Sequence, residues 1–117
     1  MIIGFTGTRY GMTQSQALQL TQLLAELHSQ HGVQEFHHGA CVGSDAEAHR
    51  LIRNGSAGKP HGWPYLSLPG VRIVCHPGPN AAAPEVASAC IADADEVRLP
   101  LPHFARNRTI VDGCDCV

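Results

Sequence analysis

Three short blocks of the sequence combine residues that can bind phosphate or move protons. The first, Gly4 to Gly11, reads G-F-T-G-T-R-Y-G and follows a short apolar run. Its glycines let the backbone approach a phosphate closely, and its amides, together with Thr6, Thr8 and Arg9, can donate hydrogen bonds to it. The same glycines are also typical of a purely structural turn, and the block does not follow the G-x-G-x-x-G pattern. Both interpretations stay open for this block.

The second block, His37 to His49, reads H-H-G-A-C-V-G-S-D-A-E-A-H and again places glycines between an apolar run and a helical pattern. Ser44 is expected to cap this helix, with Glu47 completing a capping box, and Asp45 then falls in the first turn. There the Asp45 carboxylate either complements the helix dipole or accepts hydrogen bonds from a ribose or base. Asp45 is also the best candidate for general acid or base catalysis, because the capping box already accounts for Glu47.

The third block, Pro102 to Val111, reads P-H-F-A-R-N-R-T-I-V. Arg106 and Arg108 flank Asn107 at the start of a predicted helix, where cations are unfavourable. Their presence indicates either a nearby anion or simple exposure to solvent. A guanidinium group suits bidentate phosphate binding, so the block is a second candidate phosphate site.

The chain contains 8 histidines and 5 cysteines, and both residue types are common metal ligands. Four histidines fall near predicted strand ends: His37, His38, His76 and His103. Asp45 and His49 lie four residues apart on one helix face, and Cys114 and Cys116 are close to the end of the sequence. None of these sets has the spacing of a known metal site, and no C-x-x-C pair occurs. We therefore predict reduced thiols, no metal site and no cofactor.

The elements that must position these blocks alternate along the chain. Strands are predicted at 1–6, 33–38, 71–75 and 96–101, and one more begins at 115. One helix is predicted to start at a capping box formed by Thr13 and Gln16 and to stop at Gly32. Further helices are predicted at 44–54, 84–94 and 103–112. Residues 54–70 form a long Gly/Pro-rich loop, a possible lid, in which Trp63 and Tyr65 either stack on a base or cover the core. Alternation of this kind predicts one α/β domain over 1–117, with a three-layer, doubly wound parallel sheet of about four to five strands.

The composition argues against several classes of protein. Eight basic and ten acidic residues give a net charge of -2, so the chain lacks the basic character of a typical DNA-binding module. No apolar run approaches the roughly 20 residues of a membrane span. Met1 leads directly into a strand-like run without the basic start of a signal peptide. We expect a cytoplasmic protein with no membrane partner.

Taken together and in this order, the three blocks resemble the SLOG superfamily of Rossmann-like proteins. That group includes the DNA-processing protein A (Smf) family and the LOG-type phosphoribohydrolases. Residues 41–49, C-V-G-S-D-A-E-A-H, are similar to the A-R-G-I-D-x-x-A-H block of DNA-processing protein A, and residues 104–111 are similar to its F-x-x-R-N-R-I-I block. The resemblance implies a Rossmann-like sheet with a pocket for a nucleotide-type ligand. From the blocks and the resemblance together, the candidate ligand-binding residues are Gly7, Thr8, Arg9, Gly39, Gly43, Ser44, Asp45, Arg106, Asn107 and Arg108.

Departures from the family pattern narrow the function that the resemblance implies. Val42 stands where DNA-processing protein A has an arginine, which weakens the expectation of contact with a DNA backbone. The P-G-G-x-G-T-x-x-E block, which holds the phosphate and the catalytic acid of LOG-type hydrolases, has no counterpart here. We expect the C-terminal part of the family fold to be missing and a homo-oligomer, a dimer, to cover the open sheet edge.

The function predicted from the sequence is binding of a nucleotide or nucleotide-derived ligand. Its phosphate would lie on the first glycine loop and on the Arg-Asn-Arg helix start. One alternative is a phosphoribohydrolase or N-glycosidase that acts on a nucleoside monophosphate. The other is a single-stranded DNA-binding protein related to DNA-processing protein A, with nucleic acid as a less expected partner than a small molecule.

Overall fold

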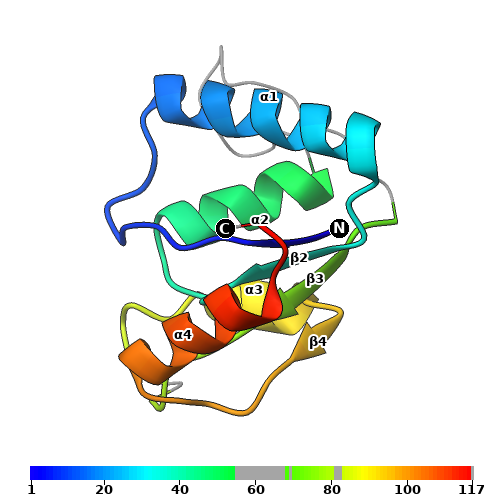
Figure 1. Cartoon of the computed structure of the whole chain (residues 1–117). Coiled ribbons are helices and arrows are strands. Elements are labelled where there is room, and N and C mark those ends of the chain that lie inside the picture. Colours follow the sequence, from blue (N-terminus) through cyan, green and yellow to red (C-terminus); the bar gives the residue numbers. More distant parts are fainter. Residues whose placement is uncertain (55–67, 69, 81–82, 117) are drawn as a thin grey trace.

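Four parallel strands form the centre of the molecule in the order β1-β2-β3-β4. The computed structural model describes residues 1–54, 68, 70–80 and 83–116 (Figure 1). The strands are β1 (Ile2–Gly4), β2 (Glu35–His38), β3 (Arg72–Cys75) and β4 (Glu96–Val97). The helices are α1 (Gln14–His31), α2 (Ser44–Asn54), α3 (Ser88–Asp93) and α4 (His103–Gly113). The predicted α/β class with a parallel sheet is confirmed.

Helices cover both faces of this sheet. Figure 1 places α1 and α2 over one face and α4 over the other. After α4 the chain returns to β1, where Ile3 forms a parallel bridge with Cys116 and the Gly4 N–H donates to the Cys116 carbonyl at 2.7 Å. The strand expected to begin at residue 115 is therefore present as a single bridge. The chain reverses its direction across the sheet beside β1, and such a switch point is where open α/β sheets bind ligands.

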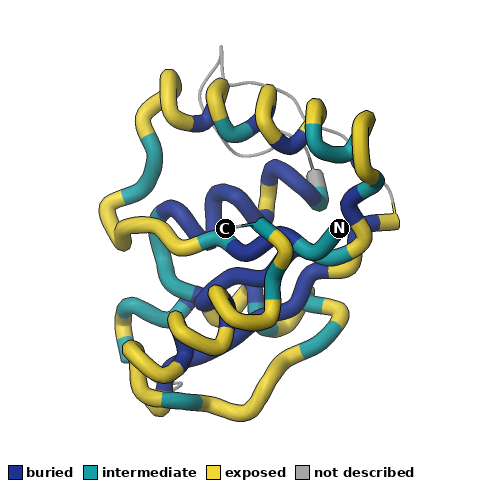
Figure 2. The backbone as a smooth tube through the Cα atoms, viewed as in Figure 1, coloured by how far each residue is buried: buried dark blue, intermediate teal, exposed yellow. Residues whose placement is uncertain are grey.

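The core lies between the sheet and α1 with α2. Phe36 and Ile73 on neighbouring strands are fully buried, as is Leu24 of α1. Figure 2 shows most of β2 and β3 as buried and the outward face of α1 as exposed. The predicted start of α1 is confirmed, because Thr13 caps the helix and forms both hydrogen bonds of a capping box with Gln16. This local chemistry fixes where the loop after β1 ends.

Two predicted elements are wrong in their bounds. The helix predicted from residue 84 begins only at Ser88, because the segment before it pairs with the loop after β2. In that pairing the Val42 N–H donates to the Glu85 carbonyl at 2.7 Å, and the Ala87 N–H donates to the Ala40 carbonyl at 2.8 Å. The strand predicted over 96–101 is confined to Glu96–Val97.

Side-chain burial along α4 also differs from the expected pattern. Ile110 is fully buried, but Phe104, the aromatic residue of the same helix, is 92% exposed. The buried partner of Ile110 on α4 is instead a charged residue, Arg106. The predicted loop over 54–70, with Trp63 and Tyr65, falls almost wholly outside the described residues. None of the helices described combines the length and apolar character needed to cross a bilayer.

Candidate functional site

The glycine loop after β1 packs directly on the start of α2. The Ser44 N–H donates to the Thr8 carbonyl at 2.9 Å. A Cβ atom on Gly7 would lie 2.5 Å from the Ser44 Cβ, and one on Gly43 would lie 2.4 Å from the backbone of Arg9. Gly43 also has a φ of +87°, which side chains rarely adopt. At least these two glycines are therefore required by the contact between the loops.

Ser44 does not act as the expected helix cap. It is the first residue of α2 itself. The Glu47 carboxylate, expected to complete a capping box, accepts a hydrogen bond from the Met12 N–H at 2.6 Å. Both residues thus tie α2 to the glycine loop, which gives the first and second sequence blocks a common structural position.

A cavity of about 290 Å³ opens where this loop meets the helices. Its lining combines backbone from the glycine loop with apolar and polar side chains: Phe5, Gly7, Thr8, Gly11, Met12, Gln16, Leu20 and Ser44. Its volume is at the lower end of the range of about 300–1,000 Å³ that is typical of small-molecule sites. It lies at the carboxyl end of β1, beside the switch point of the sheet.

Asp45 follows the last of these lining residues and is buried with an unsatisfied oxygen. It is only 3% exposed. Its Oδ2 accepts from the Gly39 N–H at 3.1 Å and from the Cys41 N–H at 3.2 Å. Its Oδ1 has no hydrogen-bond partner among the residues that the structure describes. A buried acceptor without a partner is costly, and it is the kind of group that a bound ligand satisfies.

Burial also changes the acidity of Asp45. Removal from water raises the pKa of this carboxyl group to about 6, and the hydrogen bonds from Cys41 and Gly39 and the charge of Arg106 only partly oppose the rise. Burial thus moves the pKa of the Asp45 carboxyl group toward neutrality. This property suits a group that exchanges a proton near pH 6.

Arg106 is inside the protein rather than at its surface. Its Nη1 donates to the Gly39 carbonyl at 2.8 Å and to the His76 carbonyl at 3.3 Å, at the ends of β2 and β3. Its Nη2 donates to His103 Nδ1 at 3.0 Å, and its Nε donates to the Asn107 side chain at 2.7 Å. The guanidinium group therefore holds the loops after two strands together.

The remaining predicted cations differ in position. Arg108 is exposed on α4 and pairs with Asp112 at 3.5 Å, so it does not join Arg106. Arg9 is exposed in the glycine loop, where its guanidinium lies 5.3 Å from the centre of the Tyr10 ring. The structure thus brings Gly7, Thr8, Arg9, Gly43 and Ser44 to one place and Gly39, Asp45, Arg106 and Asn107 to the adjoining one. Arg108 lies apart from both groups.

Two hydrogen-bonded histidine pairs lie on opposite faces of the β2–β3 pair. The sequence placed His37, His38 and His76 near strand ends, but it did not predict which histidines form pairs. On one face, His37 Nδ1 is 2.8 Å from His76 Nε2, and His37 Nε2 is 2.8 Å from the Glu35 carboxylate. Burial, with the charge of His37 second, lowers the pKa of His76 to about 4. The other pair joins His38 to His49. Adjacent strand residues point to opposite faces, so the His37-His38 dipeptide was a signal for this division.

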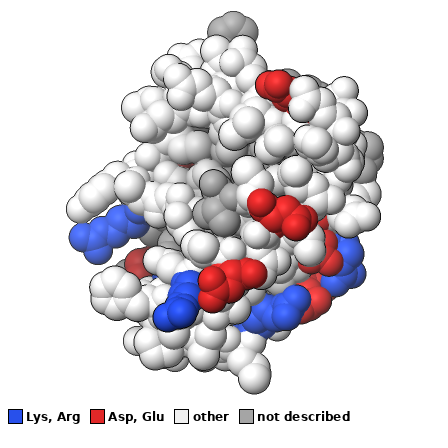
Figure 3. All heavy atoms as spheres, in the orientation of Figure 1, with Lys and Arg blue, Asp and Glu red and all other residues white. Residues whose placement is uncertain are grey.

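The charged side chains on the outer face next to α4 and β4 alternate in sign. Figure 3 shows basic and acidic side chains side by side in the lower half of the view. Arg72 and Arg98 both pair with Glu96, and the Arg72–Glu96 distance is 3.3 Å. A nucleic-acid surface normally gathers cations on one face. No observation on this face favours the DNA-binding alternative.

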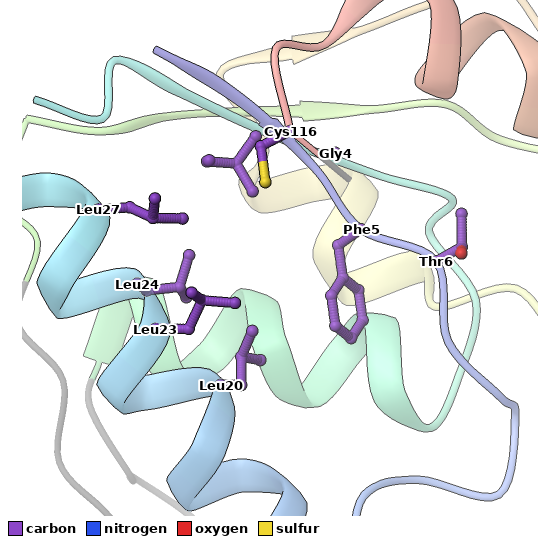
Figure 4. A pocket seen from close by; sticks show the side chains of 9 residues that line it. Gly4, Phe5, Thr6, Leu20, Leu23, Leu24, Leu27 and Cys116 are labelled. Atoms are coloured by element: carbon purple, nitrogen blue, oxygen red, sulfur yellow. The ribbon is translucent and has the colours of Figure 1, made fainter. Parts of the chain in front are cut away.

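A second, apolar cavity of about 350 Å³ lies between α1 and β1 (Figure 4). Its side chains come from Leu20, Leu23, Leu24 and Leu27 of α1, with Phe5 and Cys116 opposite. Its lining side chains are almost all apolar, so it offers a phosphate fewer hydrogen-bond donors than the glycine-loop cavity, which Thr8, Gln16 and Ser44 line. The expected homo-oligomer stays a prediction.

Comparisons with other proteins add no relatives to this description. The chain matches no family model, and searches of curated proteins and of solved structures found no match. The site must therefore be interpreted from its own geometry.

Proposed function

We propose that the protein binds a nucleotide or nucleotide-derived ligand at the carboxyl end of β1. The observation that carries this proposal is the cavity of about 290 Å³ where the glycine loop packs on the start of α2. The loop backbone and the Thr8 hydroxyl supply neutral donors for a phosphate. Arg9, which is exposed in the same loop but does not line the cavity, supplies the cation. The resemblance of the sequence blocks to SLOG proteins supports the same ligand class.

In this proposal Asp45 and Arg106 have different roles. The Asp45 Oδ1, which lacks a partner among the described residues, accepts a hydrogen bond from a sugar hydroxyl or base amino group. Arg106 acts indirectly, because its hydrogen bonds hold the Gly39 and His76 loops in place. The cation that contacts phosphate is then Arg9 instead of Arg106.

Calorimetry with the full chain tests this proposal. The titrants are the common nucleoside monophosphates, the matching nucleosides and inorganic phosphate, which separate phosphate recognition from base recognition. We expect a monophosphate to bind more tightly than its nucleoside, and Arg9→Ala to weaken binding by about tenfold. Arg108→Ala is the matched control and should bind like the wild type. No binding of any nucleotide, or equal binding by Arg9→Ala, would refute the proposal.

A second candidate function, hydrolysis of the N-glycosidic bond of a nucleoside monophosphate, is favoured by one observation. The pKa of Asp45 is raised to about 6, so this group can hold or accept a proton at neutral pH. Release of free base from a bound monophosphate, abolished in Asp45→Asn, would establish this activity. Binding without release of base would leave the protein a ligand-binding domain.

A further inference from the structure

The second histidine pair belongs to a buried cluster with a cysteine. His38 Nε2 lies 2.8 Å from His49 Nδ1 and 3.5 Å from the Cys75 sulfur. One ligand-type atom from each of these three residues falls within 4.8 Å of the other two. His38 and Cys75 are fully buried, and His49 is nearly so. The cluster lies on the face of the sheet that α2 covers, apart from the cavity at the glycine loop.

These spacings are close to those that a tetrahedral metal ion requires. Zn–N bonds of about 2.0–2.1 Å and a Zn–S bond of about 2.3 Å give edges of about 3.3 Å between nitrogens and about 3.6 Å between nitrogen and sulfur. The distance from His38 to Cys75 already fits, and the two histidine nitrogens need to separate by about 0.5 Å. One thiolate with two imidazoles is a donor set that suits zinc and copper, and it does not suit the oxygen-seeking ions magnesium and calcium.

Asp93 completes the arrangement behind His49. Its Oδ2 lies 2.8 Å from His49 Nε2, so that nitrogen carries a proton and Nδ1 presents its lone pair to the cluster. Arg53 holds the same carboxylate oxygen from Nε at 3.0 Å. The charges also balance, because a divalent ion with one thiolate leaves a single positive charge next to the Asp93 carboxylate. Carboxylate–histidine–metal arrangements of this kind orient the ligand and raise its basicity.

Metal binding would require His38 to change its tautomer and lose a hydrogen bond. Its Nδ1 accepts from the Ala40 N–H at 2.9 Å, so its proton lies on Nε2 in the metal-free protein. Coordination through Nε2 moves that proton to Nδ1 by exchange with water and breaks the Ala40 hydrogen bond. The loss of this hydrogen bond costs less free energy than a structural zinc site typically contributes, so metal binding can offset it.

A cavity borders one member of the cluster, His49. This cavity of about 260 Å³ is lined by His49, Arg50, Ala89, Cys90 and Asp93, and it therefore also borders the carboxylate behind His49. Three protein ligands leave the fourth position of a tetrahedral ion to a water molecule or another small ligand.

We propose that His38, His49 and Cys75 form a site for a zinc-class divalent cation, which Asp93 supports through its hydrogen bond to His49. Binding replaces the Cys75 thiol proton, which leaves to solvent, with a sulfur–metal bond. No electron is transferred. The site is independent of the nucleotide proposal, because its ligands do not line the glycine-loop cavity.

The test loads the full chain with zinc and then with cobalt. Protein stripped with a chelator receives one equivalent of Zn²⁺, and metal per chain is measured after desalting. We expect one zinc in the wild type, and binding weakened at least tenfold in Cys75→Ser and His49→Gln. Cys114→Ser and His31→Gln are matched controls that should retain the metal. Asp93→Asn leaves all three ligands in place and should weaken binding by about 10–100-fold.

Cobalt makes the outcome independent of whether a ligand variant folds. In the wild type, Co²⁺ bound at this site gives a thiolate charge-transfer absorption band, and Zn²⁺ displaces it. No charge-transfer band, or the same zinc content in folded Cys75→Ser as in the wild type, would overturn the proposal. The cluster would then be only a hydrogen-bonded relay between Asp93 and the core.

Discussion

Arg106 of α4 donates from Nη1 to the carbonyl oxygen of Gly39 at the end of β2, 67 positions earlier in the chain, at 2.8 Å. The type and position of Arg106 in the sequence suggested phosphate binding, but this residue is 94% buried. The same nitrogen reaches the His76 carbonyl at the end of β3. The charged group therefore organises the loops of the candidate site from within.

Truncation of this arginine should destabilise the protein. Arg106→Ala removes the donors to the Gly39 and His76 carbonyls, and we expect a loss of about 2–5 kcal/mol in the free energy of unfolding. Arg108→Ala removes an exposed ion pair and should change that free energy by less than about 0.5 kcal/mol. Urea unfolding of both variants measures the difference. Equal stabilities would mean that the buried hydrogen bonds contribute little.

Gly43 should tolerate no side chain. Gly43→Ala combines a φ of +87° with a Cβ atom 2.4 Å from the Arg9 backbone. We expect it to cost about 3 kcal/mol or more and to displace the glycine loop. Gly32→Ala is the matched control, since its φ of +70° is similar but no atom lies within 4 Å of the added Cβ. It should cost less, about 1–2 kcal/mol, although its ψ of 109° lies outside the left-handed helical region. Thermal melting of the two variants measures the difference in stability. Equal losses would mean that the positive φ alone, and not the close contact with Arg9, determines the cost.

Asp45 should destabilise the folded protein at neutral pH. Its pKa is raised from 3.8 to about 6 on folding, so the folded protein holds this proton more tightly than the unfolded chain does. Its contribution to stability is therefore complete below pH 3.8 and is lost as pH rises through 6. Because one pKa unit corresponds to about 1.4 kcal/mol, the loss is about 3 kcal/mol.

Asp45→Asn tests this sign directly. The asparagine oxygen can still accept from the Gly39 and Cys41 N–H groups, while no charge is buried. We expect the variant to be more stable than the wild type by up to about 3 kcal/mol at pH 7 and nearly equal to it at pH 4. Urea unfolding across this pH range provides the measurement. A variant that is less stable at pH 7 would show that the carboxylate is stabilised in the folded state.

The same substitution should weaken ligand binding while the fold gains stability. Asparagine places an amide donor where the Asp45 Oδ1 would accept a hydrogen bond from the ligand. The two donors then face each other, and we expect about a 10-fold to 100-fold loss of affinity for a nucleotide. Calorimetry on the variant at pH 7 is the test. Unchanged affinity would place the Asp45 oxygen outside the ligand site.

The sequence by itself determined features that depend on near neighbours in the chain. The alternation of apolar runs and helical patterns predicted the parallel sheet, and Thr13 with Gln16 predicted the start of α1. Both were confirmed, because strand alternation and capping are decided within a few residues. The glycines around Gly7 and Gly43 were also recognised as sites of close approach. Their partner, the other loop, was not evident from spacing.

Only the tertiary structure decided which chemical groups meet and which are buried. Arg106 and Arg108 are two residues apart, yet one is inside the molecule and the other is in solvent, because only one side of α4 packs on the sheet. His38, His49 and Cys75 come from three separate elements, and their contact depends on the direction of each side chain and on the pairing of β2 with β3. Burial and contact over such separations arise from packing, which no local pattern encodes.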